Sequence, residues 1–400
     1  MKKLLTLVLA VALVLTMGCA AFAEGYSGDL KIWVAENAVT FTQEQVEAFK
    51  AANPEYADMT VNIEPVGEGD AAGNVLTDVE GAADIFGFPQ DQLARLVAAG
   101  ALEEVEPGNA EVVKAENDAG SVSAAMMGET MYAYPLTSDN GYFLYYDSSV
   151  VTDPTNLEAI LADCEAAGKR FYMEINSGWY QTAFFFGAVC TLTYDTDNEG
   201  NWAGCNVDYA SENGVKALKS IIKVAQSPAF VNGSSMSTAT NVGAIVDGVW
   251  DAESVKAAFG DNYAAAKLPT VDGYQLSGFG GFKLLGVKPQ TDDDKLAACD
   301  ALASYLASGD VQLARYNELG WGPSNIAAQQ DDAVQANVAL AALADQLQYT
   351  IPQGQYPGDY WTLATGLGDD IIADKLDNAS DEELLATLQT FQDTCISYVD

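Results

Sequence analysis

The sequence predicts an α/β fold divided into two lobes, and three observations indicate it. The 400 residues exceed the usual size of one hydrophobic core, so two domains are expected. Near the N-terminus an alternating strand, a helix and a second strand follow one another, which is typical of a βαβ unit with a parallel pair. Two glycine-containing strand segments, around residues 140 and 280, are expected to cross between lobes, because glycine tolerates the dihedral change of a hinge.

The composition argues against several classes of binding partner and of chemistry. Hydrophobic residues make up 49% and charged residues 19% of the chain, which is typical of a folded protein. The formal net charge is -39, from 57 acidic and 18 basic residues, so neither nucleic acid nor an anionic membrane surface is an expected partner. The chain has no histidine, which removes the usual general base and the usual zinc ligand.

Residues 1–23 have the pattern of a signal peptide. Two lysines precede an apolar run at 4–15, and Ala21-Phe22-Ala23 forms a cleavage site before Glu24. A lipid anchor at Cys19 is the alternative, although the residues before it depart from the lipobox pattern. We therefore expect an exported protein, extracellular or in the cell envelope, either free or anchored to the outer face of the cytoplasmic membrane.

Regular elements can be placed along both halves. In the first half, Thr42 and Gln45 match a capping box that predicts a helix start, and Asn53-Pro54 predicts its end. Two β-like runs within 132–146 flank an expected turn at 139–141. The remaining predicted elements are strands at 30–34, 61–63, 83–86, 171–175, 242–246 and 282–287, helices at 93–97, 157–167, 215–225 and 293–307, and a last helix capped by Ser380 and Glu383.

Export permits disulfides, and five cysteines follow Cys19, so at least one thiol stays unpaired within the chain. Cys190 and Cys205 bracket a hairpin with its turn near 195–200, and we expect them to face each other across the strands. Cys299 lies on an apolar helical stripe and is expected to be a buried free thiol. There is no C-x-x-C motif, which disfavours metal or redox chemistry.

The order of several short segments resembles the extracellular solute-binding proteins of ABC importers, in the carbohydrate-binding class typified by maltose-binding protein. The segments span nearly the whole chain after residue 24, and they are 30–34 (LKIWV) followed by Glu36-Asn37, 83–92 (ADIFGFPQDQ), 96–102 (LVAAGAL), 134–135 (YP), 242–250 (VGAIVDGVW), 267–269 (KLP) and 280–281 (GG).

The resemblance implies a two-lobed periplasmic-binding-protein type II fold, in which each lobe is a mixed sheet flanked by helices and a multi-strand hinge joins them. The expected N-terminal lobe comprises 24–138 and 282–328. The expected C-terminal lobe comprises 139–281 and 329–400. A third crossing is expected after Trp321.

The implied function is capture of a carbohydrate, a maltodextrin-like or other short oligosaccharide, for delivery to ABC permease subunits by a monomeric protein. No enzymatic activity, metal or cofactor is expected, since neither G-x-S-x-G nor a P-loop is present. The alternative is a non-sugar ligand of the same fold, a ferric ion or a peptide. A ferric-ion-binding relative would use neighbouring tyrosines, and Tyr145 and Tyr146 are adjacent in sequence. Alternation along a strand, however, places these two rings on opposite faces.

Candidate stacking residues are aromatic rings beside glycine or acidic residues, because flat rings pack on the apolar face of a sugar. Trp250 follows Asp247-Gly248 and matches a sugar-stacking position of the family, although a ring at a helix start is often structural. The resemblance assigns the other platform positions to Trp179 or Tyr180, Tyr360 or Trp361, and Phe88.

Candidate polar residues lie in loops that meet the ligand in the family, and carboxylates and amides bind sugar hydroxyls there. They are Gln90 and Asp91, Asp139 and Asn140, and Glu36 and Asn37. Each type is also common in turns and caps. Trp321 either lines the cleft or fills the crossover. Ala38 stands where maltose-binding protein has a sugar-binding lysine, so the sugar itself is left unassigned.

Overall fold

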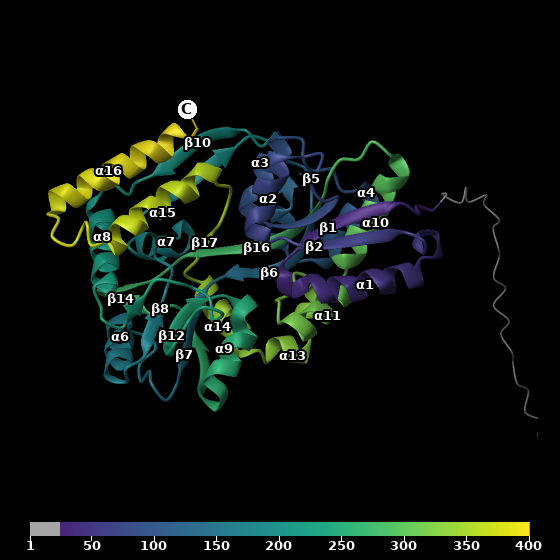
Figure 1. The fold of residues 1–400 in the computed structure, drawn as a ribbon. Helices are drawn as coiled ribbons and strands as arrows, with labels where there is room; N and C mark the ends of the chain where they lie inside the picture. Colours follow the sequence, from purple (N-terminus) through teal and green to yellow (C-terminus); the bar gives the residue numbers. More distant parts are fainter. Residues whose placement is uncertain (1–24, 400) are drawn as a thin grey trace, which may run out of the picture.

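Two mixed sheets organise the chain, and helices cover both of them (Figure 1). The structure is a computed structural model that describes residues 25–399. The expected signal peptide and Cys19 therefore lie outside the described residues. Between residues 25 and 399 no helix is both long and apolar enough to cross a bilayer.

The first sheet has six strands in the order β17-β16-β3-β1-β2, with β6 paired to β16. Strands β1, β2 and β3 are parallel, as the βαβ pattern predicts, and β16 runs antiparallel to β3. The bounds are β1 (Asp29–Val34), β2 (Thr60–Pro65), β3 (Ile85–Pro89), β6 (Tyr134–Gly141), β16 (Phe279–Val287) and β17 (Ile351–Pro352).

The second sheet has five strands in the order β11-β8-β12-β7-β13. Strands β8 and β12 are parallel, and β7 is antiparallel to both of its neighbours. The bounds are β7 (Phe143–Asp147), β8 (Arg170–Tyr172), β11 (Phe230–Val231), β12 (Val242–Asp247) and β13 (Tyr263–Ala266).

Helices pack on both sheets and close their cores. Helices α1 and α2 pack on the first sheet, whereas α6, α9 and α14 pack on the second. The bounds are α1 (Val39–Ala52), α2 (Glu68–Thr77), α3 (Leu93–Ala98), α4 (Pro107–Glu116), α5 (Ala119–Ala124), α6 (Leu157–Ala166), α7 (Gly178–Gly187), α8 (Glu212–Ala225), α9 (Ala252–Phe259), α10 (Asp293–Leu306), α11 (Gly309–Leu319), α12 (Ile326–Gln329), α13 (Asp332–Gln335), α14 (Val338–Leu347), α15 (Gly358–Ile372) and α16 (Asp381–Ser397). The short strands are β4 (Met126–Met127), β5 (Thr130–Met131), β9 (Leu192–Thr196), β10 (Trp202–Val207), β14 (Thr270–Val271) and β15 (Tyr274–Gln275).

The chain passes between the two sheets repeatedly, by way of β6, of β16 and of the segment between α11 and α14, and β17 after α14 pairs with β16 of the first sheet again. Strand β6 leads through Tyr142 directly into β7 of the second sheet, and β16 carries the chain back (Figure 1). Asn140 and Gly141 pair with Gly281 and Gly280, so β6 and β16 form one antiparallel ribbon between the sheets. The third passage lies between α11, which packs on α1, and α14, which packs on β13.

Four local predictions differ from the structure. The expected turn at 139–141 is wrong, because these residues continue β6 as paired strand. The expected capping box at Thr42 is also wrong, since α1 starts at Val39 and the Thr42 hydroxyl donates to the carbonyl of Ala38 inside the helix. Strand β8 ends at Tyr172, not at 175, and β3 starts at Ile85, not at 83.

The expected pairing of Cys190 with Cys205 is wrong as well. The hairpin forms as predicted, but its register places Cys205 opposite Tyr194, and Val207 opposite Leu192. Cys190 precedes the first paired residue and lies too far along the ladder to meet Cys205. The five cysteines among residues 25–399 are all free thiols, and Cys299 is buried as expected.

Candidate functional site

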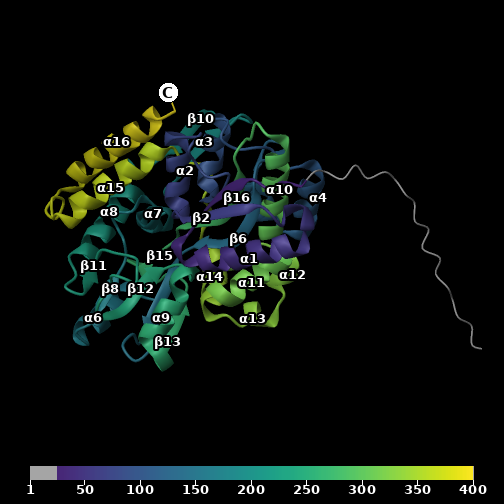
Figure 2. The same cartoon turned by 45° about the vertical axis from the view of Figure 1, so that its right-hand side comes forward.

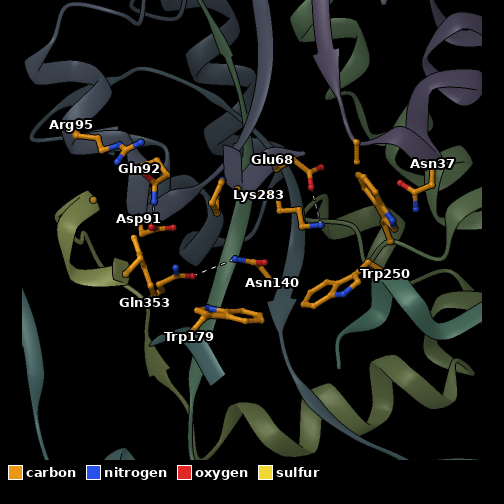
Figure 3. Close-up of a pocket in the computed structure, with 16 residues that line it drawn as sticks. Asn37, Glu68, Asp91, Gln92, Arg95, Asn140, Trp179, Trp250, Lys283 and Gln353 are labelled. Atoms are coloured by element: carbon orange, nitrogen blue, oxygen red, sulfur yellow. Dashed lines mark hydrogen bonds and ion pairs between the residues drawn. The ribbon is translucent and has the colours of Figure 1, made fainter. Parts of the chain in front are cut away.

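A cavity of about 540 Å³ lies between the two sheets, and residues from both line it (Figure 3). Most of its polar lining comes from the first sheet and its helices, and most of its aromatic lining comes from segments of the second sheet. The lining residues are Ala35, Asn37, Glu68, Gly69, Pro89, Asp91, Gln92, Arg95, Asn140, Trp179, Trp250, Lys283, Trp321, Gln353, Gly358 and Trp361.

The strand topology explains why these residues meet. Asn37 follows β1, Asp91 follows β3, Trp179 follows β8, and Trp250 follows β12. All four strands belong to parallel pairs, and each residue lies just beyond the carboxyl end of its strand. Ligands of open α/β sheets bind beyond the carboxyl ends of the strands, and here two such ends face each other.

Three tryptophans form the aromatic wall. The ring centroids of Trp179 and Trp250 are 5.7 Å apart, with an interplanar angle of 41°. Buried tyrosines support the wall from behind, since Tyr142 contacts Trp179 with centroids 4.7 Å apart and Tyr360 contacts Trp361 with centroids 4.8 Å apart. Ser177 caps α7 by accepting from the Trp179 backbone N–H, which fixes the start of that helix.

Lys283 is the cation at one end of the cavity. Its Nζ lies 4.4 Å from the ring centroid of Trp321 and 5.2 Å from that of Trp250. It also lies 3.4 Å from Oε2 of Glu68, and the side chains of Lys283 and Glu68 are only 8% and 14% exposed. The ammonium is therefore held among two indole faces and one carboxylate, which is a favourable cation–π arrangement.

Asp91 and Arg95 form the opposite end. Burial raises the pKa of the Asp91 carboxyl to about 7, against the opposing effects of the Gln92 amide and the Arg95 charge. Oδ1 of Asp91 is buried without a hydrogen-bond partner in the described part of the chain. Burial also lowers the pKa of Arg95, and Nε of this side chain lacks a partner among the same residues.

Two amides lie between these ends. The Asn140 side-chain amide donates to Oε1 of Gln353 over 3.3 Å, from the crossing strand β6 to the segment after β17. The indole N–H groups of Trp179 and Trp321 are buried and have no acceptor within residues 25–399. The lining residues thus combine polar groups with apolar ring faces, which suits a ligand with hydroxyl edges and apolar faces.

The structure brings six of the twelve predicted site residues to the cavity. They are Asn37, Asp91, Asn140, Trp179, Trp250 and Trp361. The neighbours Tyr180 and Tyr360 are buried in the core of the second sheet, because consecutive residues of a helix point in different directions.

The other four predicted residues lie outside the lining. Phe88 points into the core of the first sheet. Gln90 and Asp139 are buried: the backbone carbonyl of Gln90 accepts from Gln355, and the Asp139 carboxylate accepts from the Gly322 N–H. Glu36 lies in the exposed turn before α1.

Sequence reasoning missed Glu68, Gln92, Arg95, Lys283 and Gln353, and left Trp321 undecided. One signal was available, because Lys283 is the only charged residue of the strand FGGFKLLGV at 279–287. The others lie on helices or in loops where polar residues are ordinary. Across residues 25–399 there is no group of three or more Cys, Asp or Glu side chains placed to hold a metal ion.

Comparisons with known proteins agree with this architecture. The family model of bacterial extracellular solute-binding proteins matches residues 44–342. The galactooligosaccharide-binding protein of Bacillus subtilis (strain 168) is 24% identical over 313 residues, which are 74% of this chain and 73% of that protein.

Solved structures match over nearly the whole chain. One solved with acarbose has a TM-score of 0.81 and 25% identity, covering 93% of this chain and 99% of its own. The maltodextrin-binding protein of L. casei BL23 has a TM-score of 0.74 and 22% identity, covering 92% of this chain and 98% of its own. The Thermus thermophilus maltotriose-binding protein has a TM-score of 0.75 and 17% identity, covering 91% and 99%. The α/β fold expected from the sequence is therefore confirmed.

Proposed function

The chain belongs to the bacterial extracellular solute-binding proteins, and we propose that it captures a short oligosaccharide and delivers it to the permease of an ABC importer. This family consists of solute-binding proteins, not enzymes. The observation that carries the sugar proposal is the cavity itself, in which Trp179, Trp250 and Trp361 face carboxylates, amides and an ammonium.

The chemistry of the lining favours a sugar over other small solutes. Indole faces bury the C–H face of a pyranose ring, while carboxylates and amides bind its hydroxyl groups. The relatives include proteins named for galactooligosaccharide and for maltodextrin, and one neighbour was solved with acarbose. A linear oligosaccharide of a few rings also suits a cavity of about 540 Å³ with polar groups at both ends.

We propose that the sheets belong to two lobes that close on the ligand. The lobes are 24–138 with 282–328, and 139–281 with 329–400. Strands β6 and β16 form the ribbon between the sheets, and lining residues come from both sides. A ligand that bridges both sides favours the closed arrangement by a shift of population.

The ferric alternative has less support. Tyr145 is buried, and its hydroxyl donates to the Gly248 carbonyl over 3.0 Å, so its phenolate is not free to bind iron. Burial also raises the pKa of Tyr145 well above its ordinary value, which opposes the ionised form that iron needs. A peptide ligand is the remaining alternative and is a control below.

We propose a monomer that is either released after cleavage before Glu24 or anchored through a lipid on Cys19. Mass spectrometry of the mature N-terminus distinguishes these two forms.

Titration calorimetry and thermal shift against linear glucose and galactose oligosaccharides test the proposal. A ligand at 100 times its dissociation constant adds about 2.7 kcal/mol to the free energy of unfolding. Fe(III) and short peptides serve as controls. Trp250→Ala should weaken sugar binding by about 1–3 kcal/mol, whereas Trp202→Ala, on the remote β9–β10 hairpin, should not. If no sugar gives a binding signal or a thermal shift and a peptide or Fe(III) does, the carbohydrate assignment is overturned.

A further inference from the structure

The segment that joins β17 to α15 is bonded to the loop that follows β3. Gln355 of this segment is half-buried and is not one of the residues that line the cavity. Its side-chain Nε2 donates to the Gln90 carbonyl over 2.8 Å, and its Oε1 accepts from the Ala94 N–H, also over 2.8 Å. One side-chain amide thus spans the loop at 90–92 from end to end.

These two bonds support a short helix that has little local support of its own. Helix α3 has six residues, and in the described part of the chain its N-cap residue, Gln92, makes no side-chain capping hydrogen bond. The Ala94 N–H is one of the donors that the start of a helix leaves without an intrahelical partner. Gln355 satisfies this donor from a position 261 residues away in sequence. The start of α3 therefore depends on a distant segment.

The loop held in this way carries two residues that line the cavity, Asp91 and Gln92. The Gln92 side-chain amide donates to the Asp91 carboxylate, so these two side chains are held together. A further bond joins the same loop to the distant segment, because the Tyr356 N–H donates to the Asp91 carbonyl over 3.4 Å. Loss of the Gln355 amide would therefore loosen the backbone that sets the position of the Asp91 carboxylate.

The same segment is anchored to the aromatic side of the cavity. Tyr356 is buried in the core of the second sheet, and its hydroxyl donates to the first carbonyl of β9 over 2.6 Å. Its ring centroid lies 5.5 Å from that of Trp361, a lining residue on α15. The start of α15 lies against α3 (Figures 1 and 2), and a Cβ at Gly358 would lie 2.7 Å from a guanidinium nitrogen of Arg95. Gln355 and Tyr356 thus link one polar end of the cavity to its aromatic wall.

We propose that Gln355 is a positioning residue for ligand binding, which holds Asp91 and Gln92 at the distance from Trp361 that the ligand requires. The inference rests on the proposed function, because it takes the cavity to be the ligand site. It gives Gln355 no contact with the ligand. A site whose lining groups are already held in place loses less conformational entropy on binding, so a residue that holds them contributes to affinity.

Gln355→Leu removes both hydrogen bonds and keeps a side chain of similar size. We expect the Kd for the best ligand of the panel to rise roughly tenfold, which corresponds to about 1.4 kcal/mol. Gln346→Leu is the matched control. Gln346 accepts from the Leu268 N–H at 2.8 Å and donates to the Ser277 carbonyl at 3.0 Å, and none of these three residues lines the cavity. The control should lower the Tm and leave the Kd unchanged.

A double-mutant cycle with Asp91→Asn separates positioning from a general loss of stability. If Gln355 acts through Asp91, the double variant should lose less affinity than the sum of the two single losses. Additive losses overturn the proposal, and so does a normal Kd for Gln355→Leu or an equal loss of affinity in Gln346→Leu. Gln355→Glu keeps the acceptor for Ala94 and loses the donor to Gln90, so its Kd should be intermediate. A normal Kd for this variant overturns the proposal even if the leucine variant folds poorly.

Amide hydrogen exchange of the ligand-free protein tests the positioning step without any ligand. Exchange in the peptide 90–98 should be faster in Gln355→Leu than in the unaltered protein, and unchanged in Gln346→Leu. An unchanged rate in Gln355→Leu overturns the proposal whatever the ligand is. If no sugar binds but exchange is faster, the proposed function has failed and the positioning step has not. The affinity measurements are then made with the control ligand that binds, a peptide or Fe(III).

Discussion

Lys283 places a buried positive charge in the lining of the cavity. Its side chain is 8% exposed, and within the part of the chain that the structure describes its ammonium forms one ion pair, with Glu68 at 3.4 Å. An ammonium in that position has donors available to a ligand hydroxyl. The carboxylate beside it can accept from a neighbouring hydroxyl, so Lys283 and Glu68 together suit adjacent hydroxyl groups of one ring.

Lys283→Met should therefore weaken binding of the best sugar in the panel. Loss of a charged hydrogen bond costs about 1.5–3 kcal/mol, which is at least tenfold in Kd. Lys219→Met is a matched control, because Lys219 is 55% exposed on α8 and pairs with Asp381 on the surface. Titration calorimetry of both variants measures the effect, and an unchanged Kd for Lys283→Met would remove Lys283 from the site.

Asp91 makes stability depend on pH. Its pKa rises from an ordinary value of 3.8 to about 7, chiefly because of burial. The folded protein thus holds a proton that the unfolded chain has already lost between pH 4 and pH 7. The stability from this group is complete below about pH 4 and declines as pH rises through 7.

Asp91→Asn should remove that decline, since an amide does not titrate. Urea unfolding at pH 5 and pH 8 provides the comparison. The unaltered protein should lose more stability than the variant between these two values. An identical pH dependence in both proteins would show that Asp91 ionises normally in the fold.

At the residue scale, the sequence indicated two pairs of adjacent aromatic residues, Trp179 with Tyr180 and Tyr360 with Trp361. It did not indicate which ring of each pair reaches the cavity. Trp179 and Tyr180 are adjacent on α7, and only the packing of that helix decides which ring reaches the cavity and which enters the core. Lys283 and Glu68 were missed because their roles come from strand and helix packing across a long separation in sequence.

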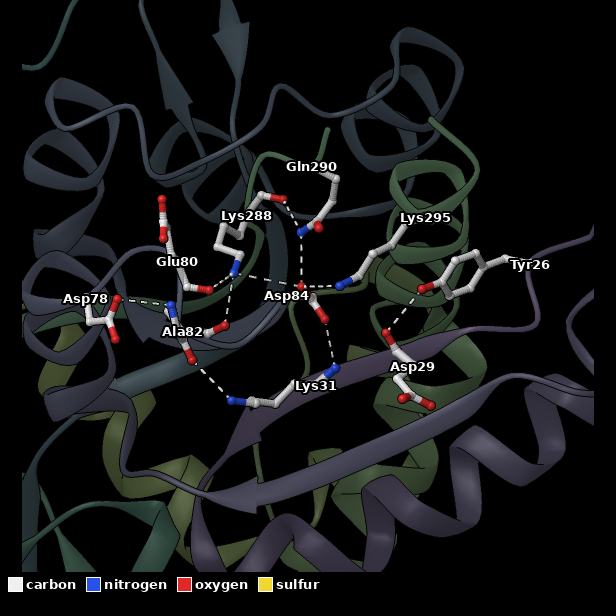
Figure 4. Close-up of polar contacts among 11 residues, drawn as sticks. Tyr26, Asp29, Lys31, Asp78, Glu80, Ala82, Asp84, Lys288, Gln290 and Lys295 are labelled. Carbon is white, nitrogen blue, oxygen red and sulfur yellow. Dashed lines mark hydrogen bonds and ion pairs between the residues drawn. The ribbon is translucent and has the colours of Figure 1, made fainter. Parts of the chain in front are cut away.

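At the scale of elements, Asp84 ties the first sheet together at the end opposite the cavity (Figure 4). It precedes β3, whereas Asp91 follows that strand. Its carboxylate accepts from the Lys31 backbone N–H at 2.9 Å and from Gln290 at 3.1 Å, and it lies 2.8 Å from Nζ of Lys295. The side chain of Asp84 is 8% exposed, so these partners replace water.

Asp84→Asn should destabilise the protein without weakening its binding. Removing one partner of a buried ion pair costs about 3 kcal/mol, because the remaining charge stays buried. Asp381→Asn is the control, since its pair with Lys219 is exposed. Urea unfolding gives the stability, and calorimetry gives the Kd. A variant with normal stability, or one that is stable but no longer binds, would contradict this structural role.

The capping-box pattern predicted a helix start correctly where the capping residues are exposed to solvent. Ser380 and Glu383 form the predicted capping box of α16. At Thr42 the same pattern failed, because the short helical turn at 36–38 already leads into α1 and the hydroxyl bonds within the helix. Likewise, Asp139 and Asn140 are turn-forming residues that pairing with β16 holds in a strand.

At the scale of the whole molecule, the crossings were predictable and the geometry of the cavity was not. Glycines at 141, 280 and 281 marked the ribbon, and the ribbon is where β6 and β16 pair. The packing there is close, since a Cβ at Gly141 would lie 2.9 Å from a methyl carbon of Leu343. How the two sheets face each other depends on the long-range packing of both, which no local pattern encodes.

The same geometry predicts a global response to ligand. Tryptophans associated with the second sheet face polar groups of the first, so a sugar that contacts both sides favours the closed arrangement. Small-angle X-ray scattering should show a smaller radius of gyration when a binding oligosaccharide is added. A sugar that does not bind, and Trp250→Ala at the same sugar concentration, should leave the radius unchanged. If calorimetry shows saturation while the radius stays constant, the two sheets do not move together on binding, and recognition occurs in a cleft that is already closed.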